Sequence, residues 1–405
     1  MLETLLIASP DGRIIAYDPY TGTVLARFNG SRCPCNSIAI VGNNQFAVSH
    51  VSEQTGAGCV NLYYWWSKSC AQSIPIPEPV VPLTAMVDGS YLFAGGVSGH
   101  IHSLSVPSGD LIHSFSAHEH PVSCLAISSD GSLVLSGSDD GTIAVTPILL
   151  LLDSTFDIES RISGFNKFIG HESSVTGLST GLGPCSGIMI SSSLDWTCKV
   201  WNVVKGIHLQ TVNFPGEMLC TVLDASETEL YAAGADGIIY KRKLKVETKN
   251  QLAEGRETIV WGRIHSGAVA AIEMANYGRT LLAVSENGRI CAWETENGKM
   301  TSSFCKKTGT VSSVVLVKGG GWFRKRGTEK GEFNGYGGTQ EVGKMVKQVA
   351  EMGETLKVVA EDRGREISNL ESAIEVNEKL LNLMLKEAKA IAKFEDSKLT
   401  LKLKK

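Results

Sequence analysis

The chain has 405 residues, of which 43% are hydrophobic and 20% are charged, a composition that excludes a largely disordered protein. Its net charge is −4, distributed unevenly: the first 318 residues hold 21 basic and 28 acidic residues, and the remainder hold 17 and 14. The net negative charge of residues 1–318 argues against binding of nucleic acid by these residues alone, because binding through counterion release needs clustered Lys and Arg.

The start of the chain and its cysteines indicate the compartment in which the protein is expected. The opening stretch MLETLLIASPDG lacks a basic leader and a small-residue cleavage site, and the apolar run at residues 147–152 is too short to cross a bilayer. We therefore expect a protein that stays inside the cell and does not associate with a membrane. The ten cysteines include no CxxC pair, and only Cys33 and Cys35 lie close together. We expect reduced, mostly buried thiols rather than a metal site.

Seven units that combine a turn with an alternating strand follow one another along the chain. They are SPDGRIIAYD from Ser9, GAGCVNLYYW from Gly56, VSGHIHSLSV from Val97, DDGTIAVTPI from Asp139, SLDWTCKVWN from Ser193, ADGIIYKRKL from Ala235 and ENGRICAWET from Glu286. The second turn position falls at Gly12, Gly58, Gly99, Gly141, Trp196, Gly237 and Gly288, so that consecutive units lie 41 to 55 residues apart. This spacing is typical of four-stranded propeller blades with loop insertions.

A strand of alternating apolar and small or polar residues precedes each unit except the first. These strands begin at Ser37, Leu83, Val122, Val175, Cys220 and Val269. A similar stretch, TVSSVVLVK at residues 310–318, has no strand pair after it. If it joins the first unit, the two ends of residues 1–318 close a ring, which removes the exposed sheet edges that favour aggregation. We therefore predict an all-β, seven-bladed propeller over residues 1–318.

The fifth unit resembles the WD-repeat family. Gly170 and His171 stand thirty residues before Trp201, which matches the family's spacing, although Asn202 replaces the usual Asp after the tryptophan. In that family a His, a strand Ser or Thr, a turn Asp and a strand Trp form a buried hydrogen-bonded tetrad, and the resemblance places it at His171, Ser191, Asp195 and Trp201. The resemblance implies a structural network, with no catalytic residue and no cofactor. A hydrolase remains possible on residue types alone, but Ser191 lies in a strand pattern without a GxSxG elbow.

The other units keep fewer of these residues. The fourth keeps His118, Ser136 and Asp140 but has Thr146 in place of the tryptophan, and the seventh keeps His265 and Trp293 with Asn287 in place of the Asp. His100 and His102 face one side of a strand and raise the possibility of a metal site. We favour a packed or solvated strand face, because no third ligand can be named.

The composition changes after Lys318. Residues 319–340 are rich in Gly and charge, which predicts a linker, and its WFRKR stretch can contact RNA, an acidic partner or a nuclear-import receptor. Residues 341–405 show helical spacing, first from Val342 to Val359 and then at Ile367, Leu370, Ile374, Asn377, Leu381 and Met384. The second stripe predicts a coiled-coil dimer in which Asn377 fixes the register. Because Gly364 interrupts the pattern, a helical hairpin and a helix packed on the propeller remain open.

Further stretches narrow the resemblance within the WD-repeat family. LIASPDGRIIAYDPYTGTVLARF, FAGGVSGHIHSLSVPSGDLI and FIGHESSVTGL resemble the WD-repeat subunit of the nuclear complex that processes the internal transcribed spacer and matures the large ribosomal subunit precursor. This implies a nuclear scaffold with an extended connection from the fourth to the fifth blade. It also implies dimerisation through the tail, binding to a helical-repeat partner, and a place on pre-60S particles before a Midasin ATPase remodels them.

A different class, the substrate receptors of ubiquitin ligases, is the main alternative. Those receptors tend to carry a basic WDxR motif after the strand tryptophan, whereas here Trp201 is followed by Asn-Val-Val and Trp293 by Glu-Thr-Glu. An enzyme ranks third, since no catalytic motif is present in the sequence.

Overall fold

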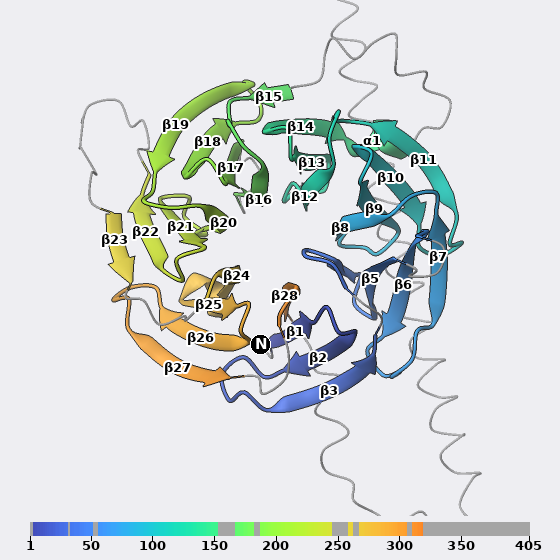
Figure 1. The fold of residues 1–405 in the computed structure, drawn as a ribbon, viewed down its shortest axis with the longest axis horizontal. Coiled ribbons are helices and arrows are strands. Elements are labelled where there is room, and N and C mark those ends of the chain that lie inside the picture. The colour runs from blue at the N-terminus through green and yellow to red at the C-terminus, as the bar shows by residue number, and fades with distance from the viewer. Residues whose placement is uncertain are drawn as a thin grey trace, which may run out of the picture. The chain divides into compact units, whose positions relative to one another are not determined.

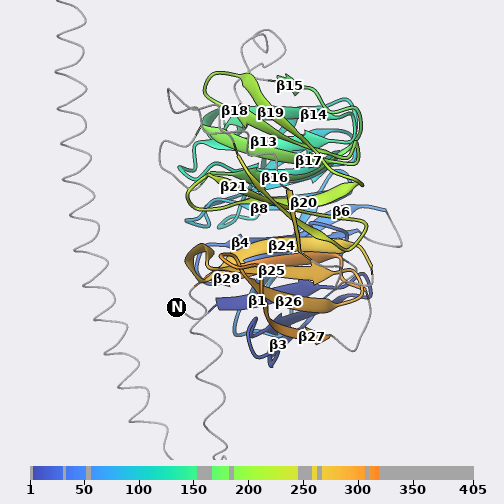
Figure 2. The same ribbon diagram turned by 90° about the vertical axis from the view of Figure 1, so that its left-hand side faces the viewer.

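The computed structural model describes residues 3–30, 33–51, 56–152, 167–181, 187–244, 258–261, 267–305 and 310–318. These residues form seven four-stranded antiparallel sheets, arranged as blades around a central channel (Figure 1). The side view in Figure 2 shows the blades stacked around the ring, with the first and last described strands in the same blade. The prediction of a seven-bladed, all-β propeller is therefore confirmed for the described residues.

Blade 1 joins the two ends of the described chain. From the channel outward it contains β28 (Ser313–Lys318), β1 (Glu3–Ala8), β2 (Arg13–Tyr17) and β3 (Val24–Asn29). β1 and β28 run antiparallel, with a register that extends from Glu3 opposite Lys318 to Ala8 opposite Ser313. The stretch at residues 310–318 thus supplies the missing innermost strand, as predicted, although the strand itself begins at Ser313.

The other six blades follow the chain from the innermost strand outward. Blade 2 holds β4 (Ile38–Val41), β5 (Gln45–Val51), β6 (Gly58–Tyr64) and β7 (Gln72–Ile76); blade 3 holds β8 (Val80–Ala85), β9 (Tyr91–Gly96), β10 (His100–Ser105) and β11 (Leu111–Ser116). Blade 4 holds β12 (Val122–Ile127), β13 (Leu133–Ser138), β14 (Thr142–Pro147) and β15 (Lys167–Ile169). Blade 5 holds β16 (Val175–Thr180), β17 (Ile188–Ser193), β18 (Thr197–Asn202) and β19 (Ile207–Asn213). Blade 6 holds β20 (Met218–Leu223), β21 (Glu229–Gly234), β22 (Ile239–Lys243) and β23 (Thr258–Trp261); blade 7 holds β24 (Val269–Ala275), β25 (Thr280–Ser285), β26 (Arg289–Glu294) and β27 (Met300–Cys305).

The turn between the second and third strands of a blade requires a residue in the left-handed region. Five blades place a glycine there, with φ between +75° and +86°, at Gly12, Gly99, Gly141, Gly237 and Gly288. Blade 5 places Trp196 there, at φ +67°, where a side chain costs roughly 1 to 2 kcal/mol relative to glycine. In blade 2 the prediction was wrong by two residues, because Gly56 has the positive φ and Gly58 already begins β6.

Two predicted inner strands begin earlier than expected. β8 starts at Val80 rather than Leu83, and β20 starts at Met218 rather than Cys220. Both strands contain a β-bulge, between Val80 and Leu83 and between Met218 and Cys220. A bulge inserts a residue and interrupts the two-residue alternation, so the alternation alone does not define where such a strand starts. β12, β16 and β24 contain a bulge at the same place, although they start where the pattern predicted.

The long connection near the fourth blade also lies elsewhere than expected. The loop from blade 4 to blade 5 is short, since β15 ends at Ile169 and β16 starts at Val175. The extra length falls inside blade 4, where α1 (Ile148–Leu152) follows β14 and buries Ile148 and Leu151. Turn-to-turn spacing counts every loop of a repeat together and cannot show which one is long.

The hydrophobic core lies between neighbouring blades rather than at one centre. One cluster joins Leu5, Ile7 and Leu316 of blade 1 to Leu282 and Val284 of blade 7, with all five side chains at most 9% exposed. Each such aliphatic side chain contributes about 1.5 to 3 kcal/mol when fully buried. Every blade therefore depends on both of its neighbours.

Among the described residues, we find no helix with the length and hydropathy needed to cross a bilayer. The predicted linker at residues 319–340 and the predicted tail at residues 341–405 lie outside the described residues. The same holds for the tail positions Ile367, Leu370, Ile374, Asn377, Leu381 and Met384, and for His265 of the seventh unit. The domain boundaries at these segments therefore stay predictions.

Removing β28 should open the ring. A chain that ends at residue 309 leaves β1 with an unpaired inner edge and is expected to be insoluble or rapidly cleaved in limited proteolysis. A chain that ends at Lys318 is the matched control, because it keeps the pairing of β1 with β28. A soluble product ending at residue 309 that melts as cooperatively as the control would contradict closure by this strand pair.

Candidate functional site

The four residues of the predicted tetrad lie together in blade 5. The blade-to-blade loop before β16 supplies His171, strand β17 supplies Ser191, the following turn supplies Asp195, and β18 supplies Trp201. His171 Nδ1 is 2.8 Å from Asp195 Oδ2, His171 Nε2 is 2.7 Å from Ser191 Oγ, and Trp201 Nε1 donates to Ser191 Oγ at 2.9 Å. The loop, the turn and two strands are thus joined by one hydrogen-bonded chain.

One assignment of donors and acceptors satisfies all three hydrogen bonds of this network. The indole N–H donates to Ser191 Oγ, the serine hydroxyl donates to His171 Nε2, and His171 Nδ1–H donates to the Asp195 carboxylate. The imidazole is therefore neutral with its proton on Nδ1. Since the serine hydroxyl and the imidazole ring each accept one hydrogen bond and donate another, the bonds polarise one another in the same direction.

The sequence analysis did not include Thr197, which completes the site around the carboxylate. Thr197 donates to Asp195 Oδ1 through its hydroxyl at 2.6 Å and through its backbone N–H at 2.9 Å. The backbone N–H of Glu172 donates to Asp195 Oδ2 at 3.1 Å. The signal for Thr197 was available, because a Thr or Ser two residues after a turn Asp is a common hydrogen-bonding arrangement.

Burial and hydrogen bonding set the protonation of the pair. Burial acts to raise the pKa of Asp195, but the bonds from Thr197 and His171 outweigh it and hold the pKa below its usual value. Burial lowers the pKa of His171, although the Asp195 carboxylate acts in the opposite direction. A charged Asp195 beside a neutral imidazole follows at neutral pH, in agreement with the donor order above.

The geometry does not suit Ser191 for hydrolysis. Its side chain is fully buried at 0% exposure, and its oxygen already accepts a hydrogen bond from the indole N–H of Trp201. A nucleophile must reach the atom that it attacks, so this Ser, His and Asp have no path to a substrate in this conformation.

Blade 4 contains a shorter network. His118 lies 2.7 Å from Ser136 Oγ through Nε2 and 2.9 Å from Thr142 Oγ1 through Nδ1. Asp140 accepts from the Thr142 backbone N–H at 2.7 Å, so it holds the turn through Thr142 and not through the imidazole. Burial lowers the pKa of His118 to about 4, with Asp140 opposing the shift. Thr146, where the sequence lacks a tryptophan, is buried.

Blade 7 shows what happens when the serine is missing. The position that matches Ser191 in strand register is Ala283. The indole N–H of the buried Trp293 has no hydrogen-bond acceptor among the described residues, and the ring instead stacks on Trp261 at a centroid distance of 5.4 Å. Among the described residues, Trp293 therefore contributes apolar packing in place of a hydrogen bond to a serine.

In blade 3 a carboxylate takes the place of the loop histidine. Glu78 Oε1 is 2.8 Å from His102 Nε2, and Ser114 Oγ is 2.9 Å from His102 Nδ1. Burial acts to raise the pKa of Glu78, but hydrogen bonds from Ser98 and His102 hold it below its usual value. The sequence analysis missed Glu78, because in this blade the acid lies in the loop and the histidine lies on the strand.

The pair His100 and His102 faces one side of β10, as the spacing predicted, with ring centroids 6.3 Å apart. His102 is 2% exposed and held by Glu78 and Ser114, whereas His100 bonds Ser98 Oγ at 2.7 Å. No group of three or more His, Cys, Asp or Glu side chains suited to a metal ion occurs in the described part of the chain. The nine cysteines described there are free thiols.

Large apolar side chains are exposed on the loops at one face of the ring, which we call the lower face. This face carries the loops that join the first strand to the second and the third to the fourth in each blade. Its most exposed apolar residues are Val87, Leu149, Val204 and Tyr277, at 75% to 89% exposure, together with Trp66 at 48%. The opposite, upper face carries the blade-to-blade loops and exposes Ile169 at 77% and Trp196 at 54%.

Comparison with known proteins agrees with this architecture. The family model described as WD domain, G-beta repeat matches residues 109–145 and 165–202, the two segments that contain the His118 and His171 networks. Protein ROOT INITIATION DEFECTIVE 3 of Arabidopsis thaliana is 30% identical over 327 residues, which cover 78% of this chain and 73% of that protein. The chain belongs to the WD-repeat family.

Two further relatives are similar to this chain. Pre-rRNA-processing protein crb3/ipi3 of Schizosaccharomyces pombe is 30% identical over 238 residues, or 58% of this chain and 52% of that protein. WD repeat-containing protein 18 of Homo sapiens is 25% identical over 315 residues, or 76% of this chain and 71% of that protein. The resemblance to the WD-repeat family is therefore confirmed, and its narrowing within that family agrees with a relative that carries the name of a pre-rRNA-processing protein.

Replacing Asp195 with Ala should destabilise blade 5 without any loss of an activity. The change leaves His171 Nδ1, Thr197 and the Glu172 N–H without their acceptor, which should lower the free energy of unfolding by about 1 to 3 kcal/mol in denaturant melts. Asp110→Ala, on an exposed loop, is the matched control and should change it by less than about 0.5 kcal/mol. Equal melts for the two variants would show that the network does not stabilise the fold.

Proposed function

We propose that this chain is a non-catalytic scaffold in the nucleus that acts in pre-rRNA processing and in maturation of the large ribosomal subunit precursor. The observation that carries the proposal is its similarity, over most of the propeller, to a family in which a relative bears the name of a pre-rRNA-processing protein. The ring itself explains why a scaffold role suits the chain, because closed blades present loops on two faces at fixed separations.

The described networks support a structural role for the polar residues. The His171 and His118 networks each tie a blade-to-blade loop to inner strands of their own blade, and both are buried. Such links hold the loops in one conformation, which lowers the entropy lost when a partner binds. The exposed apolar residues of the lower face then offer contact area on a rigid support.

The proposed partners follow from the sequence resemblance and the tail pattern. They are an elongated helical-repeat subunit of the pre-60S maturation complex, a second copy of this chain, and the pre-60S particle on which a Midasin-type ATPase later acts. The heptad spacing between Ile367 and Ile391 supports dimerisation, since an unpaired helix of this length is marginal in water.

Proteins that copurify with the chain separate this proposal from its alternative. Mass spectrometry of material bound to the intact chain, and to a chain that lacks residues 341–405, should recover ribosome-maturation factors with the first and fewer with the second. Recovery of cullin adaptors in place of ribosome-maturation factors would favour a ubiquitin-ligase receptor and would overturn the proposal.

The tail, rather than the propeller, should set the oligomeric state. Ile374→Asp combined with Leu381→Asp buries repelling carboxylates in the predicted seam and should convert a dimer to a monomer, measured by light scattering or sedimentation at micromolar concentration. Lys386→Ala, on an outer position of the heptad, should leave the dimer intact. A monomeric intact chain, or a double variant that keeps the dimer mass, would contradict the coiled-coil assignment.

A further inference from the structure

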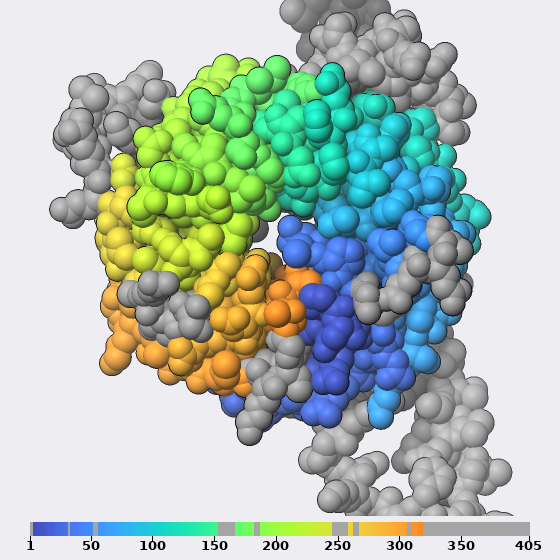
Figure 3. All heavy atoms as spheres, in the orientation of Figure 1, coloured from blue at the N-terminus to red at the C-terminus, as the bar shows by residue number. Residues whose placement is uncertain are grey.

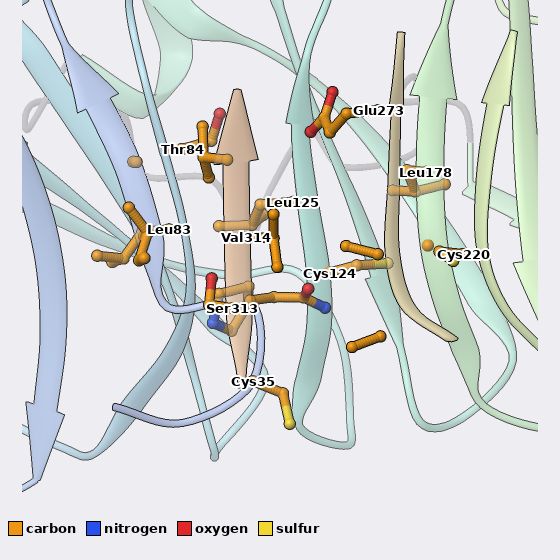
Figure 4. Close-up of a pocket in the computed structure, with 18 of the residues that line it drawn as sticks. Cys35, Leu83, Thr84, Cys124, Leu125, Leu178, Cys220, Glu273, Ser313 and Val314 are labelled. Atoms are coloured by element: carbon orange, nitrogen blue, oxygen red, sulfur yellow. The ribbon is translucent and has the colours of Figure 1, made fainter. Parts of the chain in front are cut away.

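A channel runs through the centre of the ring, bounded by the innermost strand of every blade. It forms a cavity of about 770 Å³, and its opening is visible at the centre of the space-filling view in Figure 3. The walls are hydroxyl, thiol and aliphatic side chains, including Thr84, Leu125, Leu178 and Cys220 in Figure 4. The described residues that line it include three charged side chains, Glu273, Glu286 and Lys318. The channel is therefore concave, mixed in polarity and nearly free of charge.

Glu273 lies within an inner strand of the channel wall, whereas Glu286 lies in a turn and Lys318 is the last residue of β28. It lies on β24, two residues before the strand ends at Ala275 near the lower face, and Figure 4 shows it among the side chains of the cavity. Among the described residues, its carboxylate has no hydrogen bond and no ion pair within 4.0 Å. Lys318, at the lower end of β28, acts on it only through a longer-range attraction.

The repeat does not require a carboxylate at this position. Glu273 pairs with Leu282 on the second strand of blade 7. The six positions with the same register in the other blades carry uncharged residues, namely Val315, Ala39, Thr84, Ala126, Ser179 and Val222. The other blades thus form the same inner strand without an acid, so that Glu273 is a feature of this site and not of the fold.

The side chain of Glu273 is half-buried in the wall of the channel, so its carboxylate is less well solvated than one on the outer surface. Burial raises the pKa of Glu273 to about 7, although the Lys318 ammonium acts to lower it. On the neighbouring strand β20, burial raises the pKa of the Cys220 thiol to about 12, and the charge of Glu273 adds to that shift, so this thiol stays neutral and offers no compensation. Glu286 lies at the opposite, upper mouth of the channel. A cation bound beside Glu273 would restore the ionised form.

The walls indicate which kind of cation fits. A divalent metal ion prefers several oxygen ligands, and no group of three His, Cys, Asp or Glu side chains in the described chain can supply them. One carboxylate among hydroxyl and aliphatic side chains matches a single charged head on an aliphatic stem. Lysine and arginine side chains have this form, with a flexible stem that packs on apolar walls and a head that pairs with a carboxylate.

We propose that the channel is a binding site for the side-chain cation of a lysine or arginine from a partner protein, which enters at the lower face and pairs with Glu273. The exposed Val87 and the amide of Asn43 line the same end of the channel and offer contacts to the rest of the inserted residue. This inference goes beyond the proposed function and does not depend on it, because the site can be probed with small cations.

The test uses the full chain labelled with ¹³C at the glutamate carboxyl groups. The NMR signal that disappears in Glu273→Gln belongs to Glu273, and its titration should have a midpoint near pH 7 in the free protein. Saturating n-butylammonium or n-butylguanidinium chloride should lower that midpoint by at least about one pH unit, which corresponds to a tenfold preference for the ionised form. Neutral n-butanol, which has the same stem, should leave it unchanged.

A control variant, a neutral alcohol and two inorganic cations distinguish the proposed site from its alternatives. Glu286→Gln, at the upper mouth, should keep the response of Glu273 to the butyl cations. The same shift with n-butanol would show binding by the apolar stem alone and would overturn the proposal. A shift with magnesium or calcium chloride but not with the butyl cations would identify an inorganic cation site instead. A midpoint near 4 in the free protein, which is the ordinary value of a solvated glutamate, would show that the channel does not isolate the carboxylate and would also overturn the proposal.

Discussion

The pairing of β1 with β28 is the interaction on which the rest of the structure depends. It joins Ala8 to Ser313, roughly 300 residues apart in the chain, so it carries a large entropic cost that short-range contacts do not share. The core lies between blades, as in the cluster that packs Leu5 and Leu316 against Leu282. Each blade therefore needs a neighbouring blade on both sides. Without this pair, blades 1 and 7 would each lose a partner, and the channel would lose part of its wall.

Within the closed ring, blades 3, 4 and 5 fix their connecting loops to the strands with different hydrogen-bonded side chains. A loop that connects two blades has to be fixed to the strands beside it, and blade 5 uses a neutral imidazole between a hydroxyl and a carboxylate. In blade 4 the imidazole of His118 bonds Thr142, and the carboxylate of Asp140 bonds the backbone of Thr142 and not the imidazole. In blade 3 the carboxylate of Glu78 lies in the loop and the imidazole of His102 on the strand. In each case a buried polar atom finds a partner, which matters more to stability than which residue supplies it.

The repeat pattern in the sequence was sufficient for the number of blades and for the closure, and the resemblance to the WD-repeat family indicated the four residues that lie together in blade 5. The two-residue alternation was insufficient for the starts of β8 and β20, because a bulge interrupts the first part of five inner strands. The extra length lies in the β14–β15 connection and not between blades 4 and 5, where the resemblance placed it. Glu78 was missed because it exchanges roles with a histidine, and Glu273 because a two-residue period does not show which side chains meet in the channel.

The order of the strands also has a consequence for synthesis of the protein. Among the described strands, β1 is made before the others, and its inner neighbour β28 is made after all of them. At about 5 to 20 residues per second, the interval between β1 and β28 lasts roughly 15 to 60 seconds. During this time Leu5, Leu6 and Ile7, each 0% exposed in the finished ring, have one open edge in the nascent chain. β1 is therefore the described strand that a chaperone has the longest opportunity to bind.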